Sequence, residues 1–305
     1  MAKIVIIGNS AAGFICCDTL AKLSSSNEIT VISKDKFLPY RKDNLLEYIA
    51  GKVTEHSLFV TPKDYYSVEK IDYKPGQEVS RLDIKKQRVT LKDNTKINYD
   101  FLVIASGLQC ELPDIPGTSK DGVVGFCGLE EAKTIIDKLL LVNLACCVGK
   151  ADFCLKLAKV LLDKGKEVKA IISQAVLDPM QHEKLEIISN AQPAEIIGEG
   201  SELKALKLSN GKVIGTSMII FASEYLPSTA FLKETDIIRT QKGFIVVDDR
   251  MRTNIENVFA CGAVAVNLNS GNKEKDWIDS SREGWIIGTN LIAMIERGEK
   301  ICQKS

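Results

Sequence analysis

The sequence predicts an α/β protein in which one strand–helix–strand plan occurs twice. Three observations support this fold class. An apolar, β-branched run at residues 2–7 is followed by helical apolar spacing at residues 11–23 and by a second strand at residues 29–33. The same succession returns at residues 144–173, a separation far larger than a solenoid repeat. Each succession then leads into apolar residues grouped around a polar turn, which indicates an inserted hairpin.

The first unit is bounded by residues that favour turns. Gly8 ends the first strand, and the Ser-Ser-Ser-Asn run at residues 24–27 ends the helix. Because both strands are apolar, we expect them to be parallel, buried on both faces and joined by a right-handed crossover. Residues 81–100 alternate apolar and charged side chains around a turn at residues 92–95, and lead to an apolar strand at residues 101–105.

The second unit repeats these elements in the same order. Its helix is expected to end at Gly165, since glycine is the common residue just past a helix C-terminus. The Ser-Asn-Gly run at residues 209–211 is a strong turn signal for its hairpin. The expected elements are strands at residues 144–148, 167–173 and 218–222, with a helix at residues 152–164.

Three last elements have no counterpart in the second unit, and we therefore assign them to the first domain. They are strands at residues 243–248 and 258–261 and a helix at residues 280–296. Two prolines and a glycine within residues 113–117 mark the first crossing between domains. The predicted domains are residues 1–115 with 241–305, and residues 116–240.

Composition restricts the class of function. Lys plus Arg and Asp plus Glu number 40 each, so the formal net charge is zero. A neutral chain has no electrostatic footprint for nucleic acid or for an anionic membrane. No segment reaches the roughly 18 to 20 apolar residues of a membrane span, and the N-terminal apolar run is too short for a signal peptide. We therefore expect a cytoplasmic protein that binds neither nucleic acid nor membrane.

Cysteine and histidine usage predicts neither disulfides nor a metal centre. The nine cysteines include no Cys-x-x-Cys pair, and in an unsecreted chain we expect them to be thiols that act as small buried hydrophobes. The two histidines, His56 and His182, are too few and too isolated to suggest a metal centre. We therefore expect no metal site.

The run Gly8-Asn-Ser-Ala-Ala-Gly13 lies between a predicted strand and a predicted helix, which is the setting of a dinucleotide-binding fingerprint. Gly8 would permit the tight turn, and Gly13 would let the helix approach the strand. Ser10 stands at the middle glycine position, where its small side chain narrows the approach of a phosphate without closing it. The N-terminus of the helix would then face a pyrophosphate. The alternative is a turn that binds nothing.

The residue that reads the ribose should stand about 20 residues further on, at the end of the second strand, and is usually acidic. Lys34 occupies that position, with Asp35 after it. Three interpretations remain open. Asp35 replaces the carboxylate with a shift of one residue, the ribose is not read, or Lys34 favours a phosphorylated ribose.

Five stretches taken together resemble the pyridine nucleotide–disulfide oxidoreductase superfamily, and within it the branch of NADH:rubredoxin reductases and nitrite-reductase-like flavoproteins. The resemblance implies two Rossmann-like dinucleotide-binding domains of the FAD/NAD(P)-binding fold, each with an inserted β-hairpin. FAD would bind to the first domain and a nicotinamide dinucleotide to the second, with hydride passing to flavin N5 and electrons to an acceptor. The stretches are residues 4–20, 38–42 with 45–51, 99–107, 113–117 and 258–262.

The resemblance also implies roles for individual residues. Lys42 would match the cationic residue near the flavin, and is the candidate catalytic residue. Gly262 would match the glycine before a flavin-binding aspartate, and the pair Glu283-Gly284 the start of a helix beside the isoalloxazine. The FAD pyrophosphate would lie against Gly8, Ser10, Ala11 and Gly13, and a second part of the FAD site would be lined by Ala105, Ser106 and Gly107.

Two groups of residues depart from the pattern of this family. Ala263 stands where the flavin-binding aspartate is expected. Loss of this carboxylate and of the ribose carboxylate would weaken FAD about 10²- to 10⁴-fold, since each charged hydrogen bond contributes roughly 1.5–3 kcal/mol. The second fingerprint, residues 149–154, keeps one glycine, places Asp152 in the first helical turn and has Lys156 at a position that is glutamate in the family. We expect NAD(P)H binding there to be impaired.

Two further features narrow the chemistry. No redox cysteine pair lies near Lys42, which excludes disulfide-reductase chemistry. From the resemblance we also expect no C-terminal interface domain of the kind that larger relatives carry, and hence no dimerisation through it.

The leading hypothesis is an FAD flavoprotein oxidoreductase that passes electrons between a reduced donor, such as NAD(P)H, and a redox partner protein or a small electron acceptor. A second hypothesis is a non-catalytic or electron-relay subunit of a larger redox complex that keeps the fold but not NAD(P)H binding. A third, suggested by Lys34 alone, is a module that binds another nucleotide.

Overall fold

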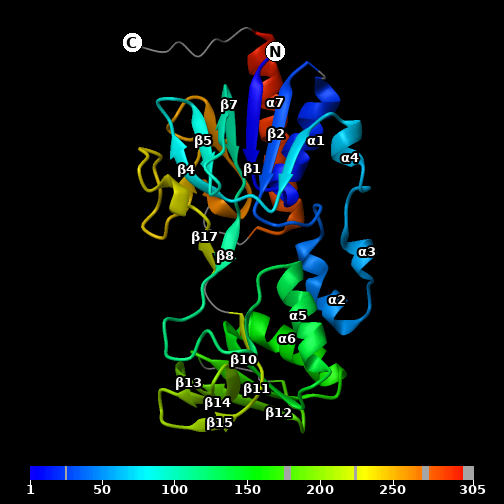
Figure 1. Ribbon diagram of the computed structural model, residues 1–305, viewed down its shortest axis with the longest axis vertical. Helices are drawn as coiled ribbons and strands as arrows, with labels where there is room; N and C mark the ends of the chain where they lie inside the picture. Colours follow the sequence, from blue (N-terminus) through cyan, green and yellow to red (C-terminus); the bar gives the residue numbers. More distant parts are fainter. Residues whose placement is uncertain (25, 175–179, 223–224, 270–274, 298–305) are drawn as a thin grey trace. The chain divides into compact units, whose positions relative to one another are not determined.

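The computed structural model describes residues 1–24, 26–174, 180–222, 225–269 and 275–297 (Figure 1). The chain divides into two compact units, each with its own parallel sheet, which confirms the predicted fold class. Unit 1 comprises Met1–Arg41, Phe59–Leu108 and Leu226–Ser305, and unit 2 comprises Lys42–Leu58 and Gln109–Tyr225.

The compact units and the predicted domains divide the chain at different residues. Residues 42–58 group with unit 2, and residues 226–240 group with unit 1. Residues 25, 270–274 and 298–305 of the predicted first domain lie outside the described residues. Which cofactor belongs to which domain stays a prediction.

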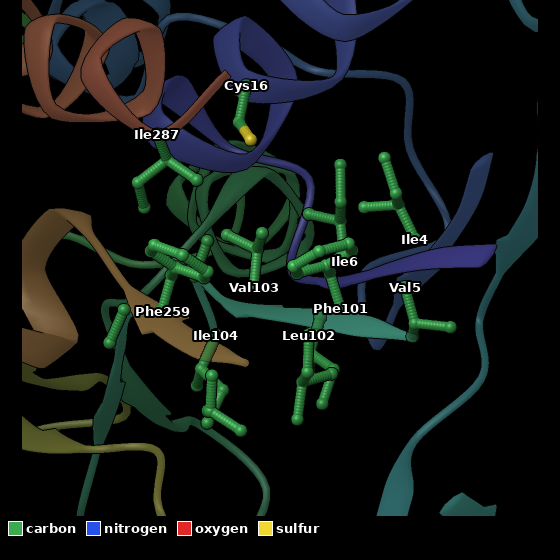
Figure 2. Close-up of a cluster of buried hydrophobic side chains, with 14 of the residues drawn as sticks. Ile4, Val5, Ile6, Cys16, Phe101, Leu102, Val103, Ile104, Phe259 and Ile287 are labelled. Carbon is green, nitrogen blue, oxygen red and sulfur yellow. The ribbon is translucent and has the colours of Figure 1, made fainter. Parts of the chain in front are cut away.

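Unit 1 is built around a five-stranded parallel sheet with the order β19-β7-β1-β2-β3. The central strands are buried on both faces, as their unbroken apolar sequences predict. Figure 2 shows Ile6 and Val103 on the face that meets the helices, and Leu102 on the opposite face. The strands are β1 (Lys3–Ile7), β2 (Glu28–Ser33), β3 (Asp72–Pro75), β7 (Phe101–Ile104) and β19 (Val258–Ala260).

Two helices pack side by side against this sheet, α1 (Ala11–Leu23) and α7 (Trp277–Glu296) (Figures 1 and 2). Their close approach depends on glycine, since a Cβ at Gly284 would lie 2.1 Å from the Ala12 carbonyl oxygen. The observed α1 matches its predicted range. Helix α7 begins three residues before its predicted start because the Asp276 side chain caps it, accepting a 2.8 Å hydrogen bond from the Asp279 amide.

Unit 2 also contains a five-stranded parallel sheet, with the order β9-β16-β10-β11-β12. Strand for strand, this order corresponds to that of unit 1, with β10 in the central position of β1. The sheet position that β19 fills in unit 1 is filled here by β9, which precedes the repeat in the chain. Strand β19 therefore has a spatial counterpart in unit 2 that the sequence did not reveal. The strands are β9 (Val123–Gly125), β10 (Leu144–Gly149), β11 (Glu167–Ile172), β12 (Leu185–Ser189) and β16 (Ile219–Ala222).

Among the helices described in unit 2, three pack against other elements of the unit, and two of these three were not predicted. Helix α5 (Leu129–Leu139) buries one apolar stripe, and α2 (Leu45–Ala50) contacts both α5 and α6. Helix α6 (Ala151–Asp163) is the predicted helix after the second fingerprint, and Gly165 follows it with a φ of +77°.

Each predicted hairpin is part of a three-stranded antiparallel sheet. In unit 2 the additional strand is β13, whose only fully buried apolar side chain is Ile196, so its alternation is weak in the sequence. The sheets are β4 (Val79–Asp83), β5 (Arg88–Leu91) and β6 (Lys96–Asn98) in unit 1, and β13 (Pro193–Glu199), β14 (Glu202–Leu208) and β15 (Val213–Gly215) in unit 2.

The remaining elements are short, and the strand expected at residues 243–248 is reduced to β18. They are η1 (Lys42–Asn44), α3 (Glu55–Leu58), α4 (Tyr65–Val68), β8 (Leu108–Cys110), β17 (Tyr225–Pro227), η2 (Ala230–Leu232), β18 (Ile245–Val246), η3 (Gly262–Val264) and β20 (Ala265–Val266).

The structure can be compared with what the sequence predicted for cysteines, membrane spans and metal sites. The described cysteines form no disulfides, and six of them are buried, as expected of small core residues. Cys110 and Cys127 are half-buried. No helix in the described ranges has the length and apolar character to cross a membrane. Within the same ranges no cluster of three or more His, Cys, Asp or Glu side chains is arranged to hold a metal ion.

Candidate functional site

The turn between β1 and α1 admits only glycine at two positions. Gly8 has a φ of +107°, and a Cβ there would lie 2.0 Å from the Ala105 carbonyl oxygen. A Cβ at Gly13 would lie 2.0 Å from the carbonyl oxygen of Gly8 itself. The two glycines therefore bring the first turn of α1 directly against the end of β1, as the fingerprint predicts.

The first turn of α1 offers unpaired backbone donors. The first helical hydrogen bond runs from the Phe14 amide to the Ser10 carbonyl oxygen, at 2.8 Å. Among the described residues no acceptor is found for the amides of Ala11, Ala12 and Gly13, and the Ser10 side chain forms no cap hydrogen bond. The first turn also contains no acidic residue. Such a helix N-terminus is suited to an anionic group.

Beside these donors lies a polar residue that the sequence analysis did not single out. Asn9 is buried, with 8% of its surface exposed. Its Oδ1 accepts a 2.6 Å hydrogen bond from the Tyr66 hydroxyl, whereas its Nδ2 has no partner in the described part of the chain. Burial raises the pKa of Tyr66, so the phenol remains a neutral donor. The sequence could not pair the two residues because 57 positions separate them.

The loop after β7 is held by residues from the C-terminal part of unit 1. The Ser106 hydroxyl donates to the Ser228 carbonyl oxygen at 2.8 Å, and the Ser228 amide donates to the Gly107 carbonyl oxygen at 2.9 Å. A Cβ at Gly107 would meet no atom within 4 Å, so this edge of the loop is open. The contact of Ala105 with Gly8 places this loop beside the first turn of α1.

The turn after β19 also lies against α1, because a Cβ at Gly262 would be 3.0 Å from the Ala12 Cβ. The Glu283 Oε2 accepts a 2.8 Å hydrogen bond from the Gly262 amide. Lys275 lies 2.7 Å from Glu283 and donates to the Gly262 and Ala265 carbonyl oxygens at 3.1 and 2.8 Å. Both charged side chains are largely buried, 17% and 15% exposed, so they hold the turn in place.

This arrangement gives Glu283 a role that the sequence did not suggest. Its carboxylate binds the backbone and Lys275 within unit 1, while Ala263 presents only a methyl group. Burial, followed by the nearby Glu283 charge, raises the pKa of the Cys261 thiol above its usual range. Cys261 is therefore a protonated core residue rather than a thiolate.

Both candidate ribose residues are engaged with other residues of the protein. Asp35 accepts a 3.0 Å hydrogen bond from the Phe37 amide and another of 3.0 Å from the Tyr40 hydroxyl. Lys34 is 66% exposed and forms a 3.6 Å ion pair with Glu78. The three interpretations of this position therefore stay open.

The structure brings most of the predicted site residues of unit 1 together around the start of α1. Lys42 begins η1 in unit 2, so its position near a flavin stays a prediction. The residues whose contacts bring them together are Gly8, Gly13, Ala105, Gly262, Glu283 and Gly284, with Ser10, Ala11, Ser106, Gly107 and Ala263 adjoining them in the chain.

The second fingerprint has the same strand–turn–helix setting with different surroundings. Gly149 ends β10 with a φ of +151°, and Lys150 is the N-cap of α6. Asp152 lies in the first turn and pairs with Lys156 at 2.8 Å, both side chains being exposed. A carboxylate already occupies the vicinity of the helix dipole, as the sequence indicated.

Comparison with known proteins places this geometry in a family. The curated relatives include human apoptosis-inducing factor 3, 24% identical over 310 residues that cover 95% of this chain and 51% of that protein. The chain thus spans about half the length of this relative. The curated relatives also include the NADH-rubredoxin oxidoreductase of Clostridium acetobutylicum, 27% identical over 277 residues that cover 86% of this chain and 68% of that protein.

Solved structures support the same fold. The covalent putidaredoxin reductase–putidaredoxin complex contains a chain that superposes with a TM-score of 0.86 at 19% identity, covering 96% of this chain and 75% of that one. At this identity the likeness bears on the fold alone. The sequence model of the pyridine nucleotide-disulphide oxidoreductases matches residues 2–284. With that match over nearly the whole chain, and with the two parallel sheets and the glycine turn at α1, the chain belongs to the pyridine nucleotide-disulphide oxidoreductase family.

Proposed function

We propose that this protein is an FAD-dependent oxidoreductase that passes electrons between a reduced donor and a redox partner protein or a small acceptor. Members of its family are FAD-dependent oxidoreductases. The single observation that carries the proposal is the first turn of α1. Its unpaired amides, its lack of acidic residues and the buried Nδ2 of Asn9 together form a donor set for a diphosphate.

The residues present in unit 1 fit such a cofactor. Gly8 and Gly13 let the backbone of the turn approach a pyrophosphate closely. The open edge at Gly107 leaves space next to the turn, and the Lys275–Glu283 pair holds the Gly262 turn against α1. When bound, FAD would supply the redox chemistry, while the protein binds, orients and shields it.

The absence of a carboxylate at Ala263 bears on affinity rather than on the class of ligand. Glu283 does not replace it, since its oxygens bind Lys275 and the Gly262 amide. The proposal therefore includes a weakened FAD affinity, because a charged hydrogen bond contributes about 1.5–3 kcal/mol.

A nicotinamide nucleotide is the donor that the family suggests, with unit 2 as its place of binding. The exposed Asp152 on the first turn of α6 opposes an anionic ligand there. The same observation favours the second candidate function, an electron-relay or non-catalytic subunit that retains the fold without NAD(P)H binding.

Visible absorption of the purified protein tests these functions. We expect flavin bands, either on purification or after reconstitution with FAD. Bleaching by NADH or NADPH under anaerobic conditions would support the oxidoreductase, and flavin bands without bleaching would support the relay subunit. A protein that remains colourless after reconstitution would contradict the oxidoreductase and the electron relay, and would favour a non-catalytic subunit or a module that binds another nucleotide.

The Gly211→Ala variant is a matched control for glycine variants at the site. Gly211 lies in the hairpin turn between β14 and β15, and a Cβ there would meet no atom within 4 Å. Because its φ is +84°, the substitution strains a turn without touching the proposed cofactor site. FAD binding by this variant should equal that of the wild type.

A further inference from the structure

Asn9 carries a buried donor that the rest of unit 1 leaves unused. Its side chain is 8% exposed and interacts with the Tyr73 hydroxyl, but no atom in the described ranges meets the geometry of a hydrogen-bond acceptor for its Nδ2. A buried N–H without an acceptor is unfavourable, and native proteins keep few such groups. The position of Asn9 is therefore explained if an oxygen from outside the chain accepts this hydrogen bond.

The orientation of the Asn9 amide is held by a chain of tyrosines. Tyr66, 5% exposed, donates its hydroxyl to Asn9 Oδ1 at 2.6 Å. The Tyr66 ring stacks on Tyr73 with centroids 4.0 Å apart, and the Tyr73 hydroxyl donates to the Phe37 carbonyl oxygen at 2.9 Å. Since Oδ1 is held by Tyr66, Nδ2 has a defined direction before any ligand binds.

Asn9 lies on the side of the turn where the ribose of a dinucleotide is read. It follows Gly8 at the carboxyl end of β1, and its partner Tyr66 lies in α4, shortly before β3. Strand β2, whose end bears the ribose-reading residue in dinucleotide-binding units, lies between β1 and β3. At that end both Asp35 oxygens accept hydrogen bonds from the protein, and Lys34 pairs with Glu78.

We propose that Asn9, held by Tyr66, donates its Nδ2 hydrogen bond to an oxygen of the adenosine diphosphate half of the bound dinucleotide. The inference rests on the proposed function, and it assigns to a neutral amide the recognition for which such sites commonly use a carboxylate. Asn9 is a ligand-binding residue in this scheme, and Tyr66 is a positioning residue that acts through it.

The test compares Asn9→Leu, Tyr66→Phe and the double variant with the wild type, using FAD, ADP and FMN as separate probes in calorimetry on flavin-free protein. Leucine matches the shape of asparagine without a donor. We expect Asn9→Leu to weaken FAD and ADP by about tenfold, the effect of one hydrogen bond, and to leave FMN binding unchanged. Tyr66→Phe should weaken FAD and ADP less, because Asn9 remains but turns more freely.

A stability measurement separates binding from folding. The double variant removes both polar partners together, so its flavin-free form should unfold at a temperature no lower than that of Asn9→Leu, in which the Tyr66 hydroxyl is left unpaired. Asn257→Ala is the matched control. Asn257 is equally buried, but its Nδ2 already donates to the Asp100 carbonyl oxygen at 2.9 Å. This variant should lose stability and keep wild-type affinity for FAD.

Failure of the inference is distinct from failure of the proposed function. Wild-type FAD affinity in Asn9→Leu overturns the inference and leaves the flavoprotein intact. Equal weakening of FMN and FAD also overturns it, because FMN lacks the adenosine diphosphate half. Binding of ADP that depends on Asn9 without any binding of FAD would support the inference and refute the flavoprotein. A wild type that binds neither FAD nor ADP overturns both.

Discussion

The two fingerprint turns show how one backbone plan can carry different local chemistry, with unpaired helix N–H groups in unit 1 and a charged pair in unit 2. Both follow the central strand of a five-stranded parallel sheet, and both begin a helix of 13 residues. In unit 1 the first turn of α1 is buried, uncharged and pressed against Gly8. In unit 2 the first turn of α6 carries the exposed Asp152–Lys156 pair.

The difference teaches that strand order alone does not make a dinucleotide site. A site needs glycines where backbone must approach backbone, and helix N–H groups that no side chain has already satisfied or screened. Exchanging residues between the two turns tests this directly, because Gly13 corresponds to Cys154 and Ala11 to Asp152 in the two runs.

The largest effect is expected from Gly13→Cys, which copies the second turn into the first. Its Cβ would lie 2.0 Å from the Gly8 carbonyl oxygen, so helix and strand must separate. We expect a loss of about 1–3 kcal/mol of unfolding free energy and at least about a 100-fold loss of FAD affinity. Chemical denaturation and flavin titration measure the two effects. The reciprocal Cys154→Gly should change stability but not FAD binding, and equal flavin losses in both would contradict the comparison.

A smaller effect is expected from Ala11→Asp, which introduces the charge of Asp152 at the corresponding position of α1. A carboxylate beside the unpaired amides of α1 would repel a diphosphate and compete for the same donors. We expect FAD affinity to fall by about 10- to 100-fold, since one or two charged hydrogen bonds are affected. The isosteric Ala11→Asn lacks the charge and is the control. An aspartate variant that binds FAD as well as the asparagine variant would show that the charge is irrelevant.

Restoring the missing carboxylate should have the opposite effect and strengthen FAD binding. Ala263→Asp should tighten FAD by about tenfold if this residue faces the flavin side chain, because it adds one charged hydrogen bond. Glu283→Gln is the informative companion, since it leaves Lys275 buried beside a neutral amide and should lower stability. Fluorescence titration of flavin-free protein measures the affinity. Unchanged FAD retention in Ala263→Asp would show that the assigned register is wrong.

The smallest effect is expected from Lys34→Glu, which restores an acidic residue at the end of β2. Lys34 is exposed and Glu78 is close, so a glutamate there is screened by water and repelled by its neighbour. We expect FAD affinity to change by less than about threefold, within the range of exposed ion pairs. Comparison of FAD titrations in low and high salt measures it. A tightening of tenfold or more would identify this position as the ribose reader after all.

Local sequence patterns predicted the elements around the site well. Helix α1 was predicted over its observed range, because its apolar spacing lies between two clear turn signals. Strand β7 differs from its expected range by one residue, since an unbroken apolar run is typical of a buried parallel strand. The glycines of the first turn were also recognisable, because few other residues permit such a turn.

Other elements left little trace in the sequence. Helix α5 and strand β9 were missed, although β9 fills the sheet position that β19 fills in unit 1. Strands β3 and β12 have intermediate burial, so neither produces a strong alternating or apolar signal. Strand β13 was missed for the same reason, whereas in unit 1 the predicted hairpin covers nearly all three strands and lacked only the turn between β4 and β5.

The sequence by itself determined the repeated plan, the position of the glycine turn and the absence of acidic residues from its first helical turn, because these depend on neighbours close in the chain. Only the tertiary structure decided which side chains are paired with one another around the turn. It joined Asn9 to Tyr66, turned Glu283 toward Lys275 and engaged Asp35 with Tyr40. Hydrogen bonds and burial depend on proximity in space, and folding brings together residues such as Asn9 and Tyr66 that local patterns cannot relate.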